Sequence, residues 1–164
     1  MIERLTKPRQ SNPAGLFLSS SSAVMRAHVL VVAQQSELAD RVQSNLSSDR
    51  LRLSIFDGLE KAEQLLANER PDLVIGMLLS HHSLLHLCRS LRAKRRTRSI
   101  AILVLAGEGY NPTQLLEAFN AGADDCLVVP FSLAKMLARV NALLRRTIQS
   151  DTSGILSFGD LWPR

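Results

Sequence analysis

The sequence predicts a doubly wound α/β fold, in which a parallel sheet is covered by helices on both faces. Five short runs rich in Val, Ile and Leu have the length of strands, and a stretch with helical periodicity follows each run. Turn residues such as Asp57-Gly58 separate the two kinds of segment. Strands that alternate with helices imply right-handed crossovers, and these crossovers make the sheet parallel.

The expected strands are continuous apolar runs. Residues 27 to 33, AHVLVVA, are typical of a strand buried on both faces. Residues 51 to 56, LRLSIF, alternate apolar with polar side chains, which indicates a strand at the edge of the sheet. Residues 72 to 78 and 99 to 106 are two further buried runs, and a fifth, shorter run precedes Pro130.

Capping residues mark the expected helix ends. Ser36 and Ser132 each precede an amphipathic segment, where a hydroxyl can accept hydrogen bonds from free backbone amides. Residues 111 to 114, Asn-Pro-Thr-Gln, combine an N-cap, a proline at the first helical position and a capping-box glutamine. Gly122 is expected to end that helix, and Pro71 follows the end of an earlier one.

Length and composition are those of one soluble domain. The 164 residues suffice for a single well-buried domain with tails, and 46% hydrophobic with 21% charged residues is ordinary for a globular protein. Cys88 and Cys126 lie within apolar runs and suit small buried side chains better than a disulfide or a metal site, so we expect a reducing, cytoplasmic location. No apolar run is long enough to span a membrane.

We expect three segments along the chain. Residues 1–25 are predicted to be a disordered leader, because four serines interrupt an apolar patch that otherwise faintly imitates a secretory signal. Met25 directly precedes the first strand and is a candidate for the true start codon. Residues 26–147 form the domain, and residues 148–164 begin as a polar linker and finish as a short apolar segment.

The net charge of +5 is concentrated in one stretch. Six cations lie within ten residues, namely Arg89, Arg92, Lys94, Arg95, Arg96 and Arg98. An anionic partner could use them, but we favour a solvated helix end and loop. Cations also stabilise a helix C-terminus, and no aromatic residue is interleaved that could stack on bases.

Four segments together resemble the receiver domain of two-component response regulators, above all those of OmpR-type transcriptional regulators. They are VLVVAQQ, PDLVIGM, IAILVLA and GADDCLVVPFS, and the resemblance covers about residues 27 to 147. It implies the flavodoxin-like, CheY-like three-layer sandwich with strand order 2-1-3-4-5 and a pocket at the carboxyl ends of strands one and three. ILSFGDL, within residues 148–164, resembles the first strand of the winged-helix DNA-binding domain that follows such receivers.

The resemblance also implies which residues occupy the phosphorylation pocket. Receivers of this family use an acidic pair for Mg²⁺, an acceptor aspartate, a hydroxyl and a lysine. The matching positions here, in that order, are Ala33, Gln34, Met77, Ala106 and Val129. A thioether cannot accept a phosphoryl group, so we predict a pseudo-receiver that has no phosphoacceptor, catalytic, cofactor or metal site and is not an enzyme.

Two further groups of residues could rebuild a site. Ser80, His81 and His82 follow the third strand and could ligate a metal or carry phosphate, but adjacent loop histidines without an acidic companion are more often solvated. Asp57 and Glu108 lie on loops that can border the crevice. Neither matches a family acid, so we expect both to be solvated surface residues.

Active OmpR-type receivers form two-fold dimers through helix four, strand five and helix five, and charged pairs hold that surface together. On this sequence Asp125 and Arg139 match the positions of one such pair. Arg145 or Arg146 lies where another basic partner falls. The resemblance therefore predicts a homodimer through the same surface.

Helix four carries Glu117 and helix five carries Lys135, and the two signs are exchanged relative to the family. Attraction within a homodimer would persist, whereas a heterodimer with an ordinary relative would set like charges together. The alternative is that these are two unrelated surface charges.

The predicted function is that of a phosphorylation-independent receiver that acts as a dimerisation module of a transcriptional regulator. DNA would be contacted only through an effector domain missing from this chain. The alternative is a stand-alone pseudo-receiver that binds and modulates a kinase or another regulator. An enzyme of flavodoxin-like fold lacks support, because no glycine-rich phosphate loop, nucleophile elbow or metal cluster is visible.

Overall fold

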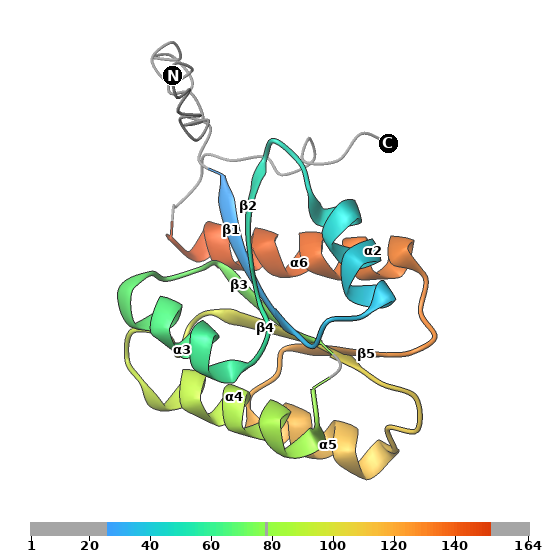
Figure 1. Ribbon diagram of the computed structural model, residues 1–164. Helices are drawn as coiled ribbons and strands as arrows, with labels where there is room; N and C mark the ends of the chain where they lie inside the picture. The colour runs from blue at the N-terminus through green and yellow to red at the C-terminus, as the bar shows by residue number, and fades with distance from the viewer. Residues whose placement is uncertain (1–25, 78, 152–164) are drawn as a thin grey trace, which may run out of the picture.

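A computed structural model describes residues 26–77 and 79–151, with side chains as far as Thr147. Five parallel strands form one sheet in the order β2-β1-β3-β4-β5 (Figure 1). The strands are β1 (Ala27–Ala33), β2 (Leu51–Phe56), β3 (Leu73–Met77), β4 (Ala101–Ala106) and β5 (Asp125–Val128). The predicted fold class and strand order are confirmed, and the alternating strand β2 lies at an edge.

Helices cover both faces of the sheet. They are α2 (Glu37–Leu46), α3 (Leu59–Asn68), α4 (His81–Ala93), α5 (Pro112–Ala121) and α6 (Leu133–Asp151). Figure 1 shows α2 and α6 on one face and α3, α4 and α5 on the other. None of the helices in the described ranges is long and apolar enough to cross a membrane.

The core consists of two apolar clusters, one on each face of the sheet. Alternate residues of β1 point to opposite faces, so Val29 and Val31 join the cluster under α2 and α6. Leu30 and Val32 join the cluster under α3, α4 and α5. Every side chain of β1 is buried, as its continuous apolar run predicted.

The predicted helix starts are confirmed by their hydrogen bonds. Ser36 Oγ accepts from the Ala39 amide at 3.1 Å, and Ser132 Oγ accepts from the Lys135 amide at 3.1 Å. Asn111 and Gln114 form a reciprocal capping box at the start of α5. These bonds satisfy amides that have no partner within the helix.

The last helix is longer than predicted. The polar linker was expected to begin at residue 148, whereas α6 continues to Asp151. Residues 131 to 153 contain neither glycine nor proline, so no helix-breaking residue ends α6 at residue 147. The predicted leader, residues 1–25, lies outside the described residues, as do residues 152–164, which include the short apolar segment of the tail.

The two cysteines are free, as expected for small side chains in apolar runs. Cys88 is buried, and burial raises the pKa of its thiol to about 11. Cys126 is half-buried, and burial raises the pKa of its thiol to about 12. Both thiols therefore stay protonated and unreactive near neutral pH.

The basic stretch differs from the solvated end that we favoured from the sequence. The Arg96 guanidinium donates to the carbonyls of Ala67 and Asn68, each at 2.8 Å, and so satisfies the end of α3. Arg92 also donates to backbone carbonyls. Lys94 and Arg95 are exposed, as predicted.

Candidate functional site

The pocket positions predicted from the sequence meet at the carboxyl edge of the sheet. Ala33 of β1 is in register with Met77 of β3. Ala106 ends β4, the next strand, and its carbonyl accepts from the Val129 amide at 3.0 Å. The chain thus places these four residues at the crevice where doubly wound folds bind ligands.

The side chains at this crevice are apolar and mostly inaccessible. Met77 has no exposed surface and packs in the cluster between the sheet and α2 and α6. Ala33 and Ala106 are buried, Val129 is half-buried and Gln34 is exposed. Over residues 26–77 and 79–151, no group of three or more His, Cys, Asp or Glu side chains is placed to hold a metal ion.

The two acidic residues considered as replacements lie on separate sides of the crevice. Asp57 follows β2 and lines a cavity of about 230 Å³ together with Ala33 and Gln34. Glu108 follows β4 and lines a different cavity of about 260 Å³. Three strand spacings of about 4.8 Å separate β2 from β4, so the two carboxylates do not converge. Both are exposed, as predicted, although each borders a cavity.

His81 is not the solvated loop histidine that we expected. It is the first residue of α4, and its Nδ1 lies 2.5 Å from the Tyr110 hydroxyl. Its Nε2 pairs with the Glu117 carboxylate on α5. A carboxylate can only accept, so Nε2 donates to Glu117. Burial raises the pKa of Tyr110 to about 12, and its protonated hydroxyl hydrogen-bonds to Nδ1. The bridge joins α4 to α5.

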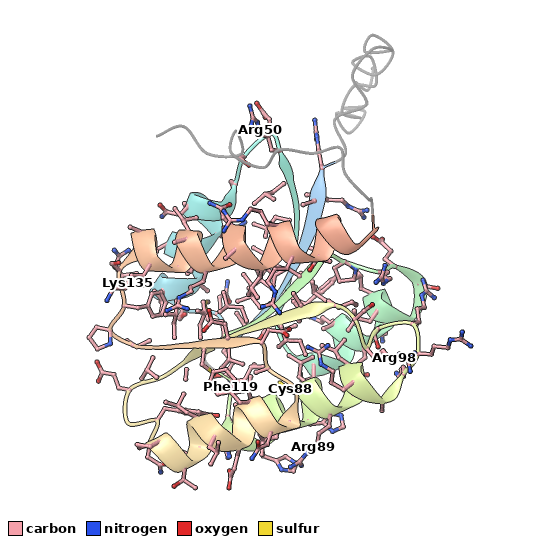
Figure 2. The ribbon with its side chains drawn as sticks, turned by 180° about the vertical axis from the view of Figure 1, so that it is seen from behind. Arg50, Cys88, Arg89, Arg98, Phe119 and Lys135 are labelled. Atoms are coloured by element: carbon pink, nitrogen blue, oxygen red, sulfur yellow. The ribbon has the colours of Figure 1, made fainter. Side chains whose placement is uncertain are left out.

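The predicted interface residues lie on α5, β5 and α6. These elements correspond to helix four, strand five and helix five of the family. Arg139 Nη1 and Asp125 Oδ2 form an ion pair at 3.0 Å within one chain. Glu117 pairs with His81, and Lys135 is exposed near the start of α6. Figure 2 shows Lys135 at the start of α6 and Phe119 on α5.

Two exposed apolar side chains on α5 were missed from the sequence. Leu116 is 60% exposed and Phe119 is 43% exposed, and they are the large hydrophobic residues that the described part of the chain leaves open to solvent. A helical periodicity analysis finds the buried stripe of a helix but does not identify apolar residues that lie beside it. Arg145 and Arg146 are exposed on α6.

Comparison with known proteins places the chain among response regulators. No protein-family model matches it. It is 32% identical over 141 residues to the response regulator MprA of Mycolicibacterium vanbaalenii, which covers 84% of this chain and 60% of that protein. It is 31% identical over 138 residues to the phosphate regulon transcriptional regulatory protein PhoB of Rhizobium meliloti, with the same shares. The chain therefore spans about 60% of the length of these relatives.

Solved structures agree with this likeness. A response regulator receiver protein from Pseudomonas putida is 28% identical with a TM-score of 0.63, and the match covers 71% of this chain and 97% of that chain. The signal receiver domain of a signal transduction histidine kinase from Syntrophus aciditrophicus shares the fold at 23% identity and a TM-score of 0.67, over 80% and 98% of the two chains. With the strand order and the sequence likeness together, the described part of this chain is a response regulator receiver domain related to the OmpR and PhoB transcriptional regulators.

Proposed function

We propose that this receiver domain works without phosphorylation, as the dimerisation module of a transcriptional regulator. The observation that carries the proposal is the fully buried Met77 at the end of β3, where the resemblance implies an acceptor aspartate. A buried thioether offers no oxygen nucleophile to a phosphoryl donor. Ala33 and Ala106 beside it supply neither a carboxylate nor a hydroxyl.

The metal requirement of the family chemistry points the same way. Mg²⁺ binds oxygen ligands and usually needs one or two carboxylates besides phosphate and water. Gln34 offers a neutral amide at that position, and Asp57 lies beyond β1, on the side of β2. The residue types at this edge therefore favour a signalling domain whose state does not depend on bound phosphate.

Dimerisation through α5, β5 and α6 is supported by the side chains on that surface. Exposed ion pairs contribute only about 0 to 1 kcal/mol each, so a stable dimer needs apolar contact as well. Leu116 and Phe119 on α5 supply exposed apolar area beside the charged residues. The His81 bridge holds Glu117 in place before any partner arrives, which lowers the entropy lost on binding.

Light scattering with beryllofluoride and Mg²⁺ tests the independence from phosphate. Beryllofluoride mimics a phosphoryl group on an aspartate, and a receiver with an acceptor aspartate serves as the positive control. We expect the molar mass of this chain, measured over a range of concentrations, to be the same with and without the mimic. A saturable, Mg²⁺-dependent change in mass would overturn the proposal.

Sedimentation velocity on the same chain tests the dimer separately. We expect a concentration-dependent dimer that is weakened when Leu116 is replaced by serine. Because Leu116 is 60% exposed, L116S costs little folding free energy and the fold is retained. A chain that stays monomeric at high concentration would contradict the dimerisation role and leave the phosphate result standing.

A further inference from the structure

We propose that a cavity between α2 and the end of β2 binds a small aliphatic amine, a ligand that carries protonated amino groups on an apolar chain. The cavity has a volume of about 230 Å³. It is lined by the end of β1 and the residues that follow it, by one side of α2, and by Ile55 and Asp57. The inference goes beyond the proposed function and does not depend on it, because neither the dimer nor the missing phosphoacceptor is one of its premises.

The floor of the cavity is apolar. Val31 and Ala33 of β1 are buried, and Ile55 of β2 and Ala39 of α2 are half-buried. All four belong to the apolar cluster under α2 and α6 or pack against it. Such a floor can hold the methylene groups of a ligand, because each Å² of apolar surface removed from water contributes about 25 cal/mol.

Five polar side chains surround this floor. They are Gln34, Gln35, Asp40, Gln43 and Asp57, and all five residues are exposed. Among the residues that the structure describes, none forms a hydrogen bond or an ion pair with these five side chains. They are therefore not needed to hold the fold together and are available to a ligand.

The charge of the lining is negative. Asp40 and Asp57 are both carboxylates, and none of the described residues that line the cavity is Lys, Arg or His. Asp40 lies in the first turn of α2, whereas Asp57 follows β2, so the two charges come from different walls. Carboxylates accept short, charge-assisted hydrogen bonds from ammonium groups, and this pair favours a cation over an anion.

The backbone fixes the positions of these carboxylates. β1 and β2 are in parallel register as far as Val32 and Phe56, so Asp57 comes directly beside the end of β1. Gly58 follows with φ of 103°, a conformation that glycine adopts without strain, and turns the chain toward α3. Asp40 is fixed within a regular helix. A site whose backbone is set in advance loses little freedom when a ligand binds.

The size and arrangement of the lining favour an organic cation over a metal ion. Pockets for drug-sized ligands have volumes of about 300 to 1,000 Å³, so a cavity of about 230 Å³ suits a chain of a few carbon atoms. Within the described ranges, no group of three or more His, Cys, Asp or Glu side chains is placed to hold a metal ion. A diamine can reach both walls through its own length, and the glutamine carbonyls can accept its remaining N–H hydrogens.

Titration of the full chain with 1,4-diaminobutane, followed by ¹⁵N–¹H NMR at constant ionic strength, tests the proposal. We expect saturable shifts of the Gln34, Gln35 and Asp57 amides. D57N and D40N are each expected to weaken binding by about tenfold, because each removes one charge-assisted contact. D57E keeps the charge and is expected to bind more tightly than D57N.

D49N is the matched control, because Asp49 is an exposed aspartate in the loop before β2 that does not line the cavity. It lies at the opposite end of β2 from Asp57, so we expect D49N to change the dissociation constant by less than about twofold. All three aspartates are exposed, so their replacement by asparagine leaves the fold intact. Shifts that rise linearly without saturation, or an equal loss in D49N, would overturn the site.

Two further titrations identify the chemistry of the ligand. Butylamine keeps the apolar chain but carries one ammonium group, and we expect it to bind more weakly than the diamine because it reaches one carboxylate only. Equal affinity for the two amines would contradict a site built on both carboxylates. Mg²⁺ is expected to shift the same amides weakly or not at all. Tighter binding of Mg²⁺ than of the diamine would identify a metal site and overturn the assignment to an organic cation.

Discussion

The two ends of the sheet differ in chemistry. At the carboxyl end, where doubly wound folds hold their ligands, Met77, Ala33 and Ala106 form a buried apolar floor. At the amino end, polar side chains satisfy backbone groups, and Arg92 alone donates to three carbonyls and a carboxylate. Topology determines where a crevice forms, whereas side chains determine whether any chemistry takes place in it.

The amino end also ties neighbouring strands together. The His28 amide on β1 donates to Asp72 at 2.7 Å, and its ring nitrogen Nε2 lies 2.9 Å from the Ser54 hydroxyl on β2. Arg52 pairs with Glu69 at 2.7 Å beside them. Specific polar contacts of this kind make the amino end sensitive to the loss of single hydrogen-bonding groups, whereas the carboxyl end should be sensitive to the introduction of polarity and to the loss of buried volume.

The largest effect is expected when Met77 is replaced by aspartate. M77D removes a fully buried apolar side chain and puts a carboxyl group in its place, which we expect to lower the free energy of unfolding by about 4 kcal/mol. Urea unfolding measures this loss. M77L is the control and should cost less than about 1.5 kcal/mol, because it conserves volume and polarity. Full stability of M77D would mean that water reaches this edge of the sheet and that the two ends are alike.

Replacing Arg92 by alanine tests the amino end in the same way. R92A removes the Arg92 donors to the carbonyls of Gly122, Arg98 and Ile100 and the cation paired with Asp124, so we expect the free energy of unfolding to fall by about 3 kcal/mol. Urea unfolding of the two single variants, R92A and R95A, measures these losses separately. Arg95 is exposed, so R95A should change stability by less than about 0.5 kcal/mol. Equal effects of the two variants would show that the contacts of Arg92 add no stability.

Helix caps and strands depend on residues close together in the chain, so they could be predicted from the sequence. Ser36, Ser132 and the capping box at Asn111 follow from residues three positions apart, and the strands follow from continuous apolar runs. The exposed apolar pair on α5 could not be predicted in this way. Strand pairing and order come from the resemblance to a family rather than from periodicity.

Contacts between distant residues left no comparable signal. His81 meets Tyr110 and Glu117, which lie 29 and 36 residues further along the chain. Arg92 reaches Gly122 across 30 residues. A hydrogen bond between two single side chains or to one carbonyl produces no period in the sequence, so a histidine in a loop and an arginine in a basic run were both interpreted as solvated.

A smaller effect is expected at the surface of α5 and α6, where the charged residues face outward. K135E places acidic side chains opposite Glu117 in the proposed dimer, and we expect the dissociation constant to rise by about tenfold because two-fold symmetry repeats each contact. Adding E117K should restore association. Sedimentation velocity measures both variants.

K61E is the control for K135E, because Lys61 is an exposed lysine on α3, away from that surface (Figure 1). An unchanged dissociation constant for K135E, or an equal change for K61E, would contradict the exchanged charge pair. Circular dichroism of E117K checks that losing the His81 partner leaves the fold intact.

The smallest effect concerns the protonation of His28 at the amino end. Burial, with a further contribution from Arg52, lowers the pKa of His28, whereas Glu69, 3.8 Å from Nδ1, and Asp72 raise it less. Because the folded-state pKa lies below the unfolded value of 6.5, the unfolded chain takes up the proton first as the pH falls. The contribution of His28 to stability is therefore complete above about pH 6.5 and is lost below it.

Urea unfolding of wild type, H28Q and H82Q at pH 7.5 and pH 5.5 isolates that contribution. Acidification should destabilise the wild type more than H28Q, because glutamine cannot take up the proton. H82Q should follow the wild type, since His82 is exposed on α4. If the wild type instead gained stability over H28Q at pH 5.5, the carboxylates of Glu69 and Asp72 would outweigh burial, and the amino end would favour a charged histidine rather than a neutral one.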